Sequence, residues 1–569
     1  MSGSLRHLPN VEQLITQQRD RFASALEQDE GFFISRNPTS VAADGTVHFV
    51  CRDGAERTED IHVELGESFP FEKPVVRLRN VAQGAPALHM MADGSLCLYD
   101  DFSGWSAGTT PKELVERIAE ALRRGADNDW RDIDLQPDFH RYFPRTGIMV
   151  FGETWSPPAN AKAGRFSACR SSDGTSFATQ ATHKLDPGGS RRAVEDRVFG
   201  LLNLDDLRPG PAVWFSLQLA PGPKLNARDF LVEVDRCVGE PTGFSSRILR
   251  AVYGDKATPG AVVVALGFPE NVSTGQEWYF FAFTSDDRRV HWNNSDALSG
   301  ISVTAFESAP ADRASLLRRS KPDAAISSAR VCIYGIGAIG STISLQLAKV
   351  GIQSLLLVDR DVMRPTNAVR HAVSIRATGV PKQIALAALA NSHNPYCDVE
   401  TADDITYDLT TLRQQIMSAQ LVIDSTANRS FSLLLCGIAC ELNIPYIEVA
   451  SYRNGAIGRI RVTRPHIDAC QLCYQAGYLE KGTYPAIKGD VDQFREVGCA
   501  SPVAMSLTCD LDVVANICVQ VSLEVLRGRP QSENHIVIVN EPDDGLPQFG
   551  RGLHYQRWAP IPGCALCGS

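Results

Sequence analysis

The sequence lacks a hydrophobic run long enough to cross a membrane. Its most apolar stretch, FSLLLCGIAC, stops at Glu441, well short of the roughly 20 residues that a membrane-spanning helix needs. The first residues, MSGSLRHLPNVEQL, contain no apolar core of the kind found in secretory signals. These two absences predict a soluble, cytoplasmic protein that does not enter a membrane.

An excess of basic residues is also missing. The net charge is -10 and the pI is about 5.7, which argues against a protein that coats nucleic acid. The 44% hydrophobic and 21% charged fractions are typical of globular proteins and exclude bulk disorder. A chain of 569 residues is too long for one hydrophobic core, so we expect about three domains.

Cysteine, by contrast, is plentiful. The chain has 15 cysteines, and an odd number without a sign of export does not predict a disulfide framework. Several thiols lie inside apolar runs, where buried core positions are expected: Cys332, Cys436, Cys440 and Cys518. The remaining cysteines need separate interpretations.

Residues 1–145 read as a compact α+β unit. NVEQLITQQRDRFASALEQ has the apolar spacing of an amphipathic helix, and TVHFVCR, DIHVELG and VVRLRN are typical of strands. TPKELVERIAEALRRG then predicts a second helix, with Thr110 as its N-cap, Pro111 at its first position and Gly125 after its end.

Residues 146–310 carry no chemical motif. AVWFSLQLA and AVVVALGF predict strands in a mixed middle domain whose role the sequence does not indicate. From VCIYGIGAIGS onward, strands and helices alternate, which predicts a parallel α/β sheet of the Rossmann type. We therefore expect a third domain over residues 311–569.

A nucleotide-binding loop opens this third domain. Gly335, Gly337 and Gly340 follow an apolar strand and precede a helix, which allows the backbone to approach a phosphate at the helix N-terminus. The next strand, SLLLV, leads to Asp359, which is placed to accept hydrogen bonds from a ribose. These features alone would also fit an NAD-dependent oxidoreductase.

The residues after this loop favour a triphosphate over a nicotinamide. Arg370 and Lys382 add two cations soon after Asp359 in the sequence, and Asn367 lies between Asp359 and Arg370. A further strand, AQLVIDSTAN, ends at Asp424, where open α/β sheets bind their ligands and where a Mg²⁺ ligand is plausible.

On these motifs the third domain resembles the adenylating family of ThiF, MoeB and the ubiquitin-activating enzymes. The resemblance implies that ATP and Mg²⁺ are used to attach AMP to a C-terminal glycine carboxylate. It implies ribose contacts from Asp359, phosphate contacts from Asn367, Arg370 and Lys382, and a metal contact from Asp424. The cations would neutralise charge on the phosphoryl oxygens and on the leaving pyrophosphate.

Members of this family often form homodimers in which one protomer lends an arginine to the other. Arg318 and Arg319, in LLRRSKP, are the candidates in this chain.

Four cysteines form two CxxC pairs. DACQLC contains Cys470 and Cys473, and GCALCGS contains Cys564 and Cys567. Four thiolates with this spacing predict a closed, tetrahedral, structural Zn²⁺ site without an open position for catalysis. Adenylating relatives carry such a zinc between comparable segments.

Cys499 lies between the two CxxC pairs, in FREVGCASPVAMSLTCDLD. In relatives that form a thioester, the crossover loop after the first pair carries the nucleophilic cysteine, and Cys499 occupies the corresponding place. Cys509 is the alternative, but its apolar, helix-like surroundings favour a place in the core.

The N-terminal region resembles the ubiquitin-conjugating fold. ESFPFEKPVVRLRN, followed by HMMADGSLCLYDDFSGWSAGTT, matches a Tyr/Phe-Pro-Phe-x-x-Pro strand exit, an Asn/Asp-Gly-x-x-Cys-Leu stretch and a Trp-Ser pair. Cys97 falls on the thioester cysteine of that family. The family's His-Pro-Asn is HMM here, so Met91 replaces the asparagine, and a thioether cannot form an oxyanion hole.

A conjugating domain joined to an activating domain resembles the bacterial fusion proteins of CBASS antiphage operons. The resemblance implies adenylation, a thioester on Cys499, transfer to Cys97 and conjugation to an amine on a target. The protein partner would have a flexible C-terminus, either a cGAS-like nucleotidyltransferase or a ubiquitin-like protein. Two alternatives remain open: a sulfur-carrier activator whose N-terminal domain only binds, and a binding scaffold with an inactive conjugating fold.

Overall fold

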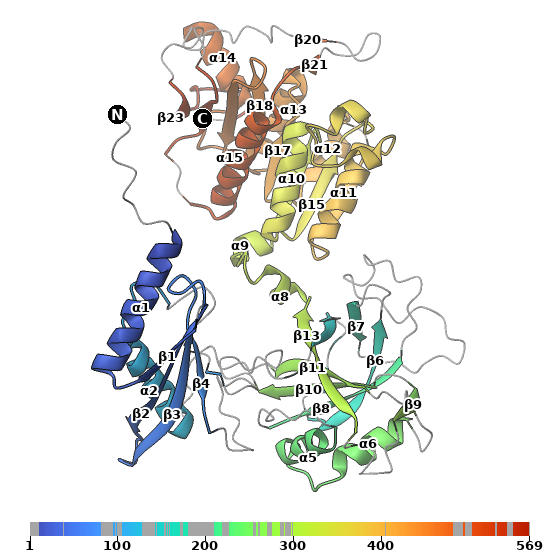
Figure 1. The fold of residues 1–569 in the computed structure, drawn as a ribbon. Helices are drawn as coiled ribbons and strands as arrows, with labels where there is room; N and C mark the ends of the chain where they lie inside the picture. The colour runs from blue at the N-terminus through green and yellow to red at the C-terminus, as the bar shows by residue number, and fades with distance from the viewer. Residues whose placement is uncertain are drawn as a thin grey trace, which may run out of the picture. The chain divides into compact units, whose positions relative to one another are not determined.

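In the computed structural model the chain forms two compact units, one that ends at Pro310 and one that begins at Ala311 (Figure 1). Among the described residues, no helix is both long enough and apolar enough to cross a membrane. The structure describes residues 11–37, 39–80, 95–96, 98–99, 105–127, 143, 145–152, 155, 157–158, 160–170, 175–179, 210–218, 227–253, 258–259, 262–269, 276–284, 289–290, 298, 300–403, 405–481, 493–494, 503–529, 532–542 and 550–567.

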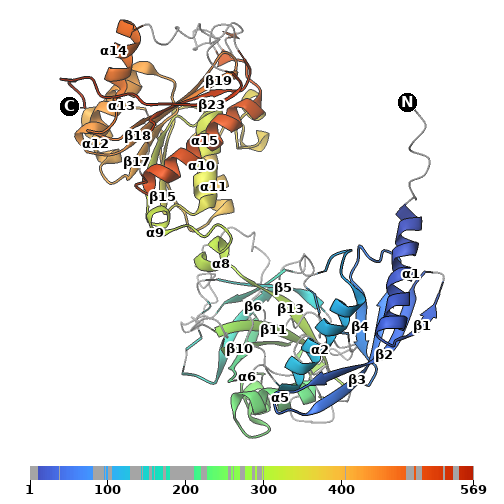
Figure 2. The same cartoon turned by 90° about the vertical axis from the view of Figure 1, so that its left-hand side faces the viewer.

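The first unit begins with a four-stranded antiparallel sheet in the order β1-β2-β3-β4. Two helices cover one face of this sheet (Figure 2), and both contribute to one core with alternate residues of β2 and β3. This is the α+β arrangement that the sequence predicts. The elements are α1 (Val11–Asp29), β1 (Phe33–Arg36), β2 (Val41–Val50), β3 (Glu56–Leu65), β4 (Val75–Leu78) and α2 (Pro111–Asp127).

The predicted start of α2 is confirmed, and its predicted end is wrong. The backbone N–H of Thr110 donates to Glu113 Oε2 at 2.7 Å, and Glu113 N–H donates back to Thr110 Oγ1 at 3.3 Å, which is a capping box. The helix continues past Gly125 to Asp127, whose carboxylate accepts from the Arg52 N–H at 3.1 Å. A contact distant in the sequence thus extends the helix beyond its local stop signal.

The rest of the first unit is a closed seven-stranded barrel, in the order β10-β11-β13-β5-β7-β6-β8. A separate two-stranded pair, β9 and β12, lies outside the barrel order. The elements are β5 (Arg145–Phe151), β6 (Ala163–Arg170), β7 (Thr175–Thr179), β8 (Gly210–Ser216), α5 (Ala227–Val238), α6 (Phe244–Tyr253), β9 (Thr258–Pro259), β10 (Val262–Pro269), β11 (Gln276–Thr284), β12 (Arg289–Val290) and β13 (Ser302–Pro310).

Both faces of the barrel strands are apolar. Phe215 and Phe281 pack on the same core as α5 and α6, whereas the alternating residues Trp214 and Phe280 share a core with strands from around the ring. Gly164 leaves room for this aromatic interior, because a Cβ there would lie 2.4 Å from the Trp214 ring. Since neither face is polar, the strands lack the polar–apolar alternation that marks a half-buried strand in a sequence.

The second unit is built on an eight-stranded sheet in the order β16-β15-β14-β17-β18-β19-β22-β23. The strands from β16 to β18 are parallel, and β19, β22 and β23 are antiparallel. The elements are α8 (Arg313–Leu317), α9 (Ala324–Ser327), β14 (Arg330–Tyr334), α10 (Ala338–Val350), β15 (Ser354–Val358), η1 (Pro365–Asn367), η2 (Ile375–Ala377), α11 (Lys382–His393), β16 (Asp398–Ala402), α12 (Leu409–Ile416), β17 (Leu421–Asp424), α13 (Arg429–Glu441), β18 (Tyr446–Tyr452), β19 (Ile457–Thr463), α14 (Gln471–Lys481), β20 (Gln493–Phe494), β21 (Val503–Ala504), α15 (Thr508–Leu526), β22 (His535–Val539) and β23 (Gly552–Gln556).

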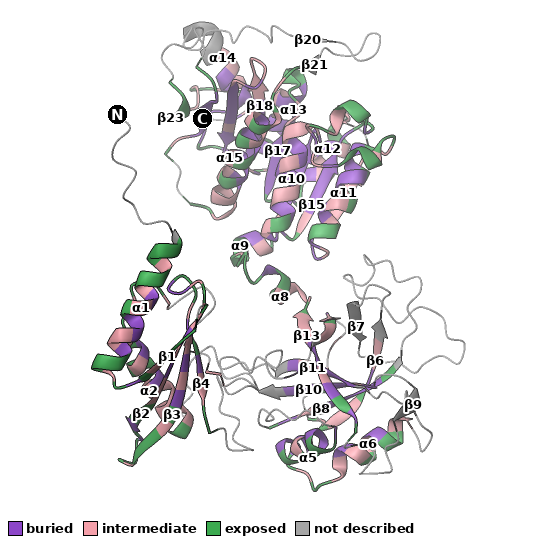
Figure 3. Cartoon of the chain, in the orientation of Figure 1, coloured by how far each residue is buried: buried purple, intermediate pink, exposed green. Residues whose placement is uncertain are grey.

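Helices cover both faces of this sheet, so its central strands are buried throughout (Figure 3). Alternate residues of β14 divide between two cores: Val331 and Ile333 pack with α10, α11 and α15, whereas Cys332 and Tyr334 pack with α12, α13 and α14. The predicted parallel α/β architecture is confirmed. The four thiols expected in the core, Cys332, Cys436, Cys440 and Cys518, are buried.

Candidate active site

The predicted nucleotide loop lies where β14 ends and α10 begins. Gly335 has a φ of +84°, and a Cβ there would lie 2.7 Å from the Thr426 amide nitrogen. A Cβ on Gly340 would lie 2.0 Å from the Gly335 carbonyl oxygen. Gly337, the N-cap of α10, has no atom within 4 Å of its Cβ position. Two glycines thus close the turn, and the third leaves open space before the helix N-terminus, as a phosphate requires.

Asp359 holds this loop from the neighbouring strand. It follows β15, which pairs in parallel with β14, so both strands end at the same edge of the sheet. Asp359 Oδ2 accepts from the Ile336 N–H at 2.5 Å, and Oδ1 accepts from the Asp361 N–H at 2.8 Å. Asp359, the predicted ribose contact, therefore lies beside the glycine loop, and two backbone donors orient its carboxylate.

Lys382 begins α11 and reaches back toward the same edge. Its Nζ forms an ion pair with Asp361 Oδ2 at 2.9 Å, in which the lysine side chain is 11% exposed and the aspartate side chain is 59% exposed. Because the aspartate is largely in solvent, this ion pair is weak, and an anionic ligand could compete for the ammonium group. Lys382 is thus a cation near the loop, as the sequence predicts.

The segment between β15 and α11 carries Asn367 and Arg370. Asn367 Oδ1 accepts from the Arg364 N–H at 3.0 Å, and the Arg370 N–H donates to the Asn367 carbonyl oxygen at 2.9 Å. The next residue, His371, is buried and contacts the glycine loop directly, with Nε2 2.9 Å from the Ile336 carbonyl oxygen. Sequence reasoning missed His371, although it stands beside a predicted phosphate ligand.

Asp424, the predicted Mg²⁺ ligand, is buried at the end of β17. It is 0% exposed, and burial raises the pKa of its carboxyl group. Oδ1 accepts from the Thr426 N–H at 2.9 Å and from its hydroxyl at 2.7 Å, and Oδ2 accepts from the Tyr446 hydroxyl at 2.9 Å. Three hydrogen bonds thus orient this carboxylate at the end of β17. Its role as a Mg²⁺ ligand stays a prediction.

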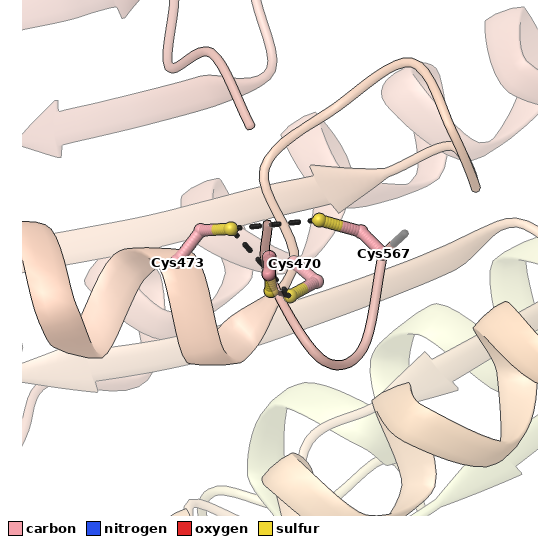
Figure 4. Close-up of side chains that lie close together, drawn as sticks. Cys470, Cys473 and Cys567 are labelled. Atoms are coloured by element: carbon pink, nitrogen blue, oxygen red, sulfur yellow. Dashed lines mark hydrogen bonds between the residues drawn. The ribbon is translucent and has the colours of Figure 1, made fainter. Parts of the chain in front are cut away.

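The four cysteines of the two CxxC pairs converge at one place. Cys470 and Cys473, at the start of α14, lie 3.8 Å apart between their sulfurs. The C-terminal segment brings Cys564 to 3.5 Å from Cys470 and Cys567 to 3.5 Å from Cys473 (Figure 4). A tetrahedral zinc with Zn–S bonds of about 2.3 Å requires sulfurs about 3.8 Å apart, so the group fits Zn²⁺.

Hydrogen bonds support this cluster from outside. The Ile561 N–H donates to Cys473 Sγ at 3.3 Å. Asp468, which is fully buried, accepts from Arg464 on its own turn and from Arg557 on the C-terminal segment. The predicted zinc group therefore ties the end of the chain to the sheet.

Comparison with known proteins identifies this unit. Residues 315–549 match the ThiF family. This part of the chain is a ThiF-family domain.

Relatives match part of this chain and, in one case, most of it. The uncharacterized protein y4oA of Sinorhizobium fredii is 25% identical over 295 residues, 48% of this chain and 47% of that protein. The uncharacterized protein y4qC of the same organism is 27% identical over 509 residues, 83% and 82% of the two chains. The SAMP-activating enzyme E1 of Haloferax volcanii is 29% identical over 160 residues, 28% and 57%. This chain thus spans about half the length of y4oA and of the Haloferax enzyme.

Both predicted nucleophiles, Cys97 and Cys499, lie outside the described residues. The strands that flank Cys499 in the sequence, β20 and β21, pair antiparallel with each other. Cys509, in the first turn of α15 of the ThiF domain, is exposed, so the expectation that it lies in the core is wrong. Arg318 and Arg319 are exposed directly after α8.

Several described residues that flank Cys97 in the sequence contact one another. The rings of Phe69, Tyr99 and Trp105 pack together, and Trp105 Nε1 donates to the Pro70 carbonyl oxygen at 2.8 Å. Lys73 Nζ donates to the Tyr99 carbonyl oxygen at 2.9 Å. His89, Met91, Asp93 and Gly94 lie outside the described residues.

Proposed function

We propose that this chain uses ATP to activate the C-terminal carboxylate of a partner protein. A carboxylate oxygen of the partner attacks the α-phosphorus of ATP. The bond between the α-phosphorus and the oxygen that bridges it to the β-phosphate breaks, and pyrophosphate leaves. The observation that carries the proposal is the open glycine loop of a ThiF-family domain beside Asp359 and Lys382. The relative named SAMP-activating enzyme E1 supports it.

In this step the side chains act by position and charge. Asp359 accepts hydrogen bonds from the ribose, and the N-terminus of α10 receives a phosphate at Gly337. Lys382 exchanges Asp361 for phosphoryl oxygens, with Arg370 and Asn367 as further phosphate contacts. Magnesium, when bound with ATP, supplies additional charge neutralisation.

Two thiols would carry the acyl group onward. The Cys499 thiolate attacks the acyl carbon of the adenylate and AMP leaves, which forms a thioester. The Cys97 thiolate then attacks the carbonyl carbon of this thioester, and the Cys499 thiolate leaves. An amine on a target attacks the second thioester, loses a proton and releases Cys97. Zinc at the four-cysteine cluster would be structural, and we propose a homodimer in which Arg318 or Arg319 serves the partner protomer.

The acyl donor that we propose is a cGAS-like nucleotidyltransferase with a flexible C-terminus, in an antiphage role, because the order of domains resembles the CBASS fusion proteins. The resemblance to the ThiF, MoeB and ubiquitin-activating family favours a second candidate, a ubiquitin-like or sulfur-carrier protein. In that case the N-terminal domain would only bind the partner.

The test of adenylation is ATP–pyrophosphate exchange with the full chain and C-terminal peptides of both donor types. Each peptide is compared with the same peptide carrying a C-terminal amide, which has no C-terminal carboxylate to activate. Exchange with a free carboxylate and none with its amide is expected. Absence of exchange with every peptide, together with no ATP binding, would refute the proposal.

The order of the thiols is tested on non-reducing gels with the donor that supports exchange. Cys499→Ala should keep exchange and lose every thioester, whereas Cys97→Ala should keep a thioester on Cys499 and lose the conjugate to an amine. Cys509→Ala, at the exposed thiol of α15, is the matched control and should behave as wild type. A thioester lost only with Cys509 would reassign the first nucleophile.

A further inference from the structure

His371 joins the segment before α11 to the glycine loop through both of its ring nitrogens. Nε2 lies 2.9 Å from the Ile336 carbonyl oxygen, and the Val373 N–H donates to Nδ1 at 3.0 Å. The intervening residue is also fixed, because the Ala372 N–H donates to Ser341 Oγ on α10 at 3.1 Å. Three successive residues are thus bound to the loop, to α10 or to one another.

These contacts determine the tautomer of His371. A backbone N–H can only donate, so Nδ1 must be the acceptor and must carry no proton. The proton of the neutral ring is then on Nε2, which donates it to the Ile336 carbonyl. The imidazole therefore accepts at one end and donates at the other, and it is buried at 8% exposure.

Ile336 is held on both sides by these neighbours. Its N–H donates to Asp359, and its carbonyl accepts from His371. The Ile336 carbonyl belongs to the same planar trans peptide as the Gly337 N–H, and in such a peptide the two groups point in opposite directions. When the carbonyl is directed at the buried histidine, the Gly337 N–H is directed away from it, and the Cβ position of Gly337 faces open space.

We infer that His371 is a positioning residue for phosphate binding, which aims the Gly337 N–H at the nucleotide by holding the Ile336 carbonyl. The inference rests on the proposed use of ATP and adds a residue to it. His371 acts through the backbone and does not touch the ligand.

The contact with the Val373 N–H requires the neutral ring. In the imidazolium both nitrogens carry protons, so the Val373 N–H would face a second donor. Burial lowers the pKa of His371 below its ordinary value of 6.5, and the charge of Lys382 acts in the same direction, whereas the hydrogen bond to the Ile336 carbonyl and the charge of Asp359 oppose it. Asp361, paired with Lys382, and Arg370, the preceding residue, are the other charged groups at this edge. The imidazole of the folded protein therefore stays neutral, and its contact with the Val373 N–H stays intact, until the pH falls to the lowered pKa.

The first test compares ATP with adenosine, which lacks the phosphates, by equilibrium binding to the full chain. His371→Leu should weaken ATP binding about tenfold, the effect of losing one well-aimed hydrogen bond to an anion, and should leave adenosine binding unchanged. His371→Gln, whose amide can still donate to the Ile336 carbonyl, should restore most of the ATP affinity. His535→Gln replaces another buried histidine of the same domain and should change neither ligand.

The second test repeats both binding measurements with His371→Asn, whose shorter amide does not reach the Ile336 carbonyl, and compares them with His371→Gln. The asparagine variant should lose ATP affinity and keep adenosine affinity, and this comparison remains decisive if the leucine variant does not fold. Equal losses for ATP and adenosine would overturn the inference. A wild-type chain that binds adenosine and ATP equally would overturn it too, and one that binds neither would refute the proposed function.

Discussion

Replacing one thiol of the four-cysteine cluster should release zinc and loosen the end of the chain. We choose Cys473→Ser, because this thiol contacts Cys470 at 3.8 Å and Cys567 at 3.5 Å and accepts the Ile561 N–H. Its loss removes one of four ligands and leaves the C-terminal segment to be held by Asp468, Arg557 and the surrounding core.

The expected magnitude follows from binding linkage. A metal present at about 1,000 times its dissociation constant stabilises the folded state by about 4 kcal/mol. In a domain of about 250 residues, 1 kcal/mol moves the midpoint of thermal unfolding by about 2–4 °C. The variant, or wild type treated with a strong chelator, should therefore unfold about 8–16 °C below the zinc-bound protein.

The assay combines metal analysis with thermal unfolding of chains purified without chelators. Wild type should contain about one zinc per chain. Cys518→Ala is the control, because Cys518 is equally buried but belongs to the core on the other face of the sheet. It should keep its zinc and lose about 1 kcal/mol from a small cavity. A wild-type chain without zinc, or a Cys473→Ser chain with full zinc and an unchanged midpoint, would refute the reasoning.

Three other predictions concern the same domain. Gly340→Ala should lower the free energy of unfolding in urea by about 3 kcal/mol or more, because the added Cβ overlaps backbone atoms. Gly337→Ala should keep the free energy of unfolding and lower the affinity for ATP in a binding assay, because its Cβ would enter the open space before α10. Asp424→Asn should lower the free energy of unfolding in urea by about 1–3 kcal/mol, because a buried hydrogen bond is lost. Unchanged stability with abolished exchange would contradict this structural role and support the predicted metal contact. Burial and the charges nearby lower the pKa of His535 from 6.5 to about 3, so its contribution to stability is complete above 6.5 and falls as the pH drops toward 3. His535→Gln should therefore flatten this part of the pH dependence of the unfolding free energy, and a curve parallel to wild type would contradict the pKa shift.

The features that the sequence predicted well are those whose signal is local. Thr110 caps α2 through a residue three positions away, and each CxxC pair is a short spacing that brings two thiols into one cluster. The glycine loop is similar, because its turn, strand and helix are contiguous in the chain. In these features, residues that lie close in the sequence also lie close in the structure, so the spacing alone predicts the contact.

The features that the sequence did not indicate depend on distant contacts. Asp424 stands at the expected strand end, and only the fold shows that it accepts from the Tyr446 hydroxyl of the next strand. His371 looks like any polar residue until the fold brings the Ile336 carbonyl to it. The barrel was not foreseen, because strands with two apolar faces carry no alternation, and its closure depends on pairings such as β13 with β5, which are far apart in the chain.

By itself, then, the sequence determined which residues of this chain can do chemistry and which local elements carry them: a phosphate loop before a helix, paired thiols, and capped helices. Only the tertiary structure decided which of those residues are exposed, which are saturated with partners and which meet across strands. The physical reason is that a side chain's chemistry is set by its type, whereas its accessibility, its partners and its pKa are set by what packs against it, and those neighbours come from every part of the chain.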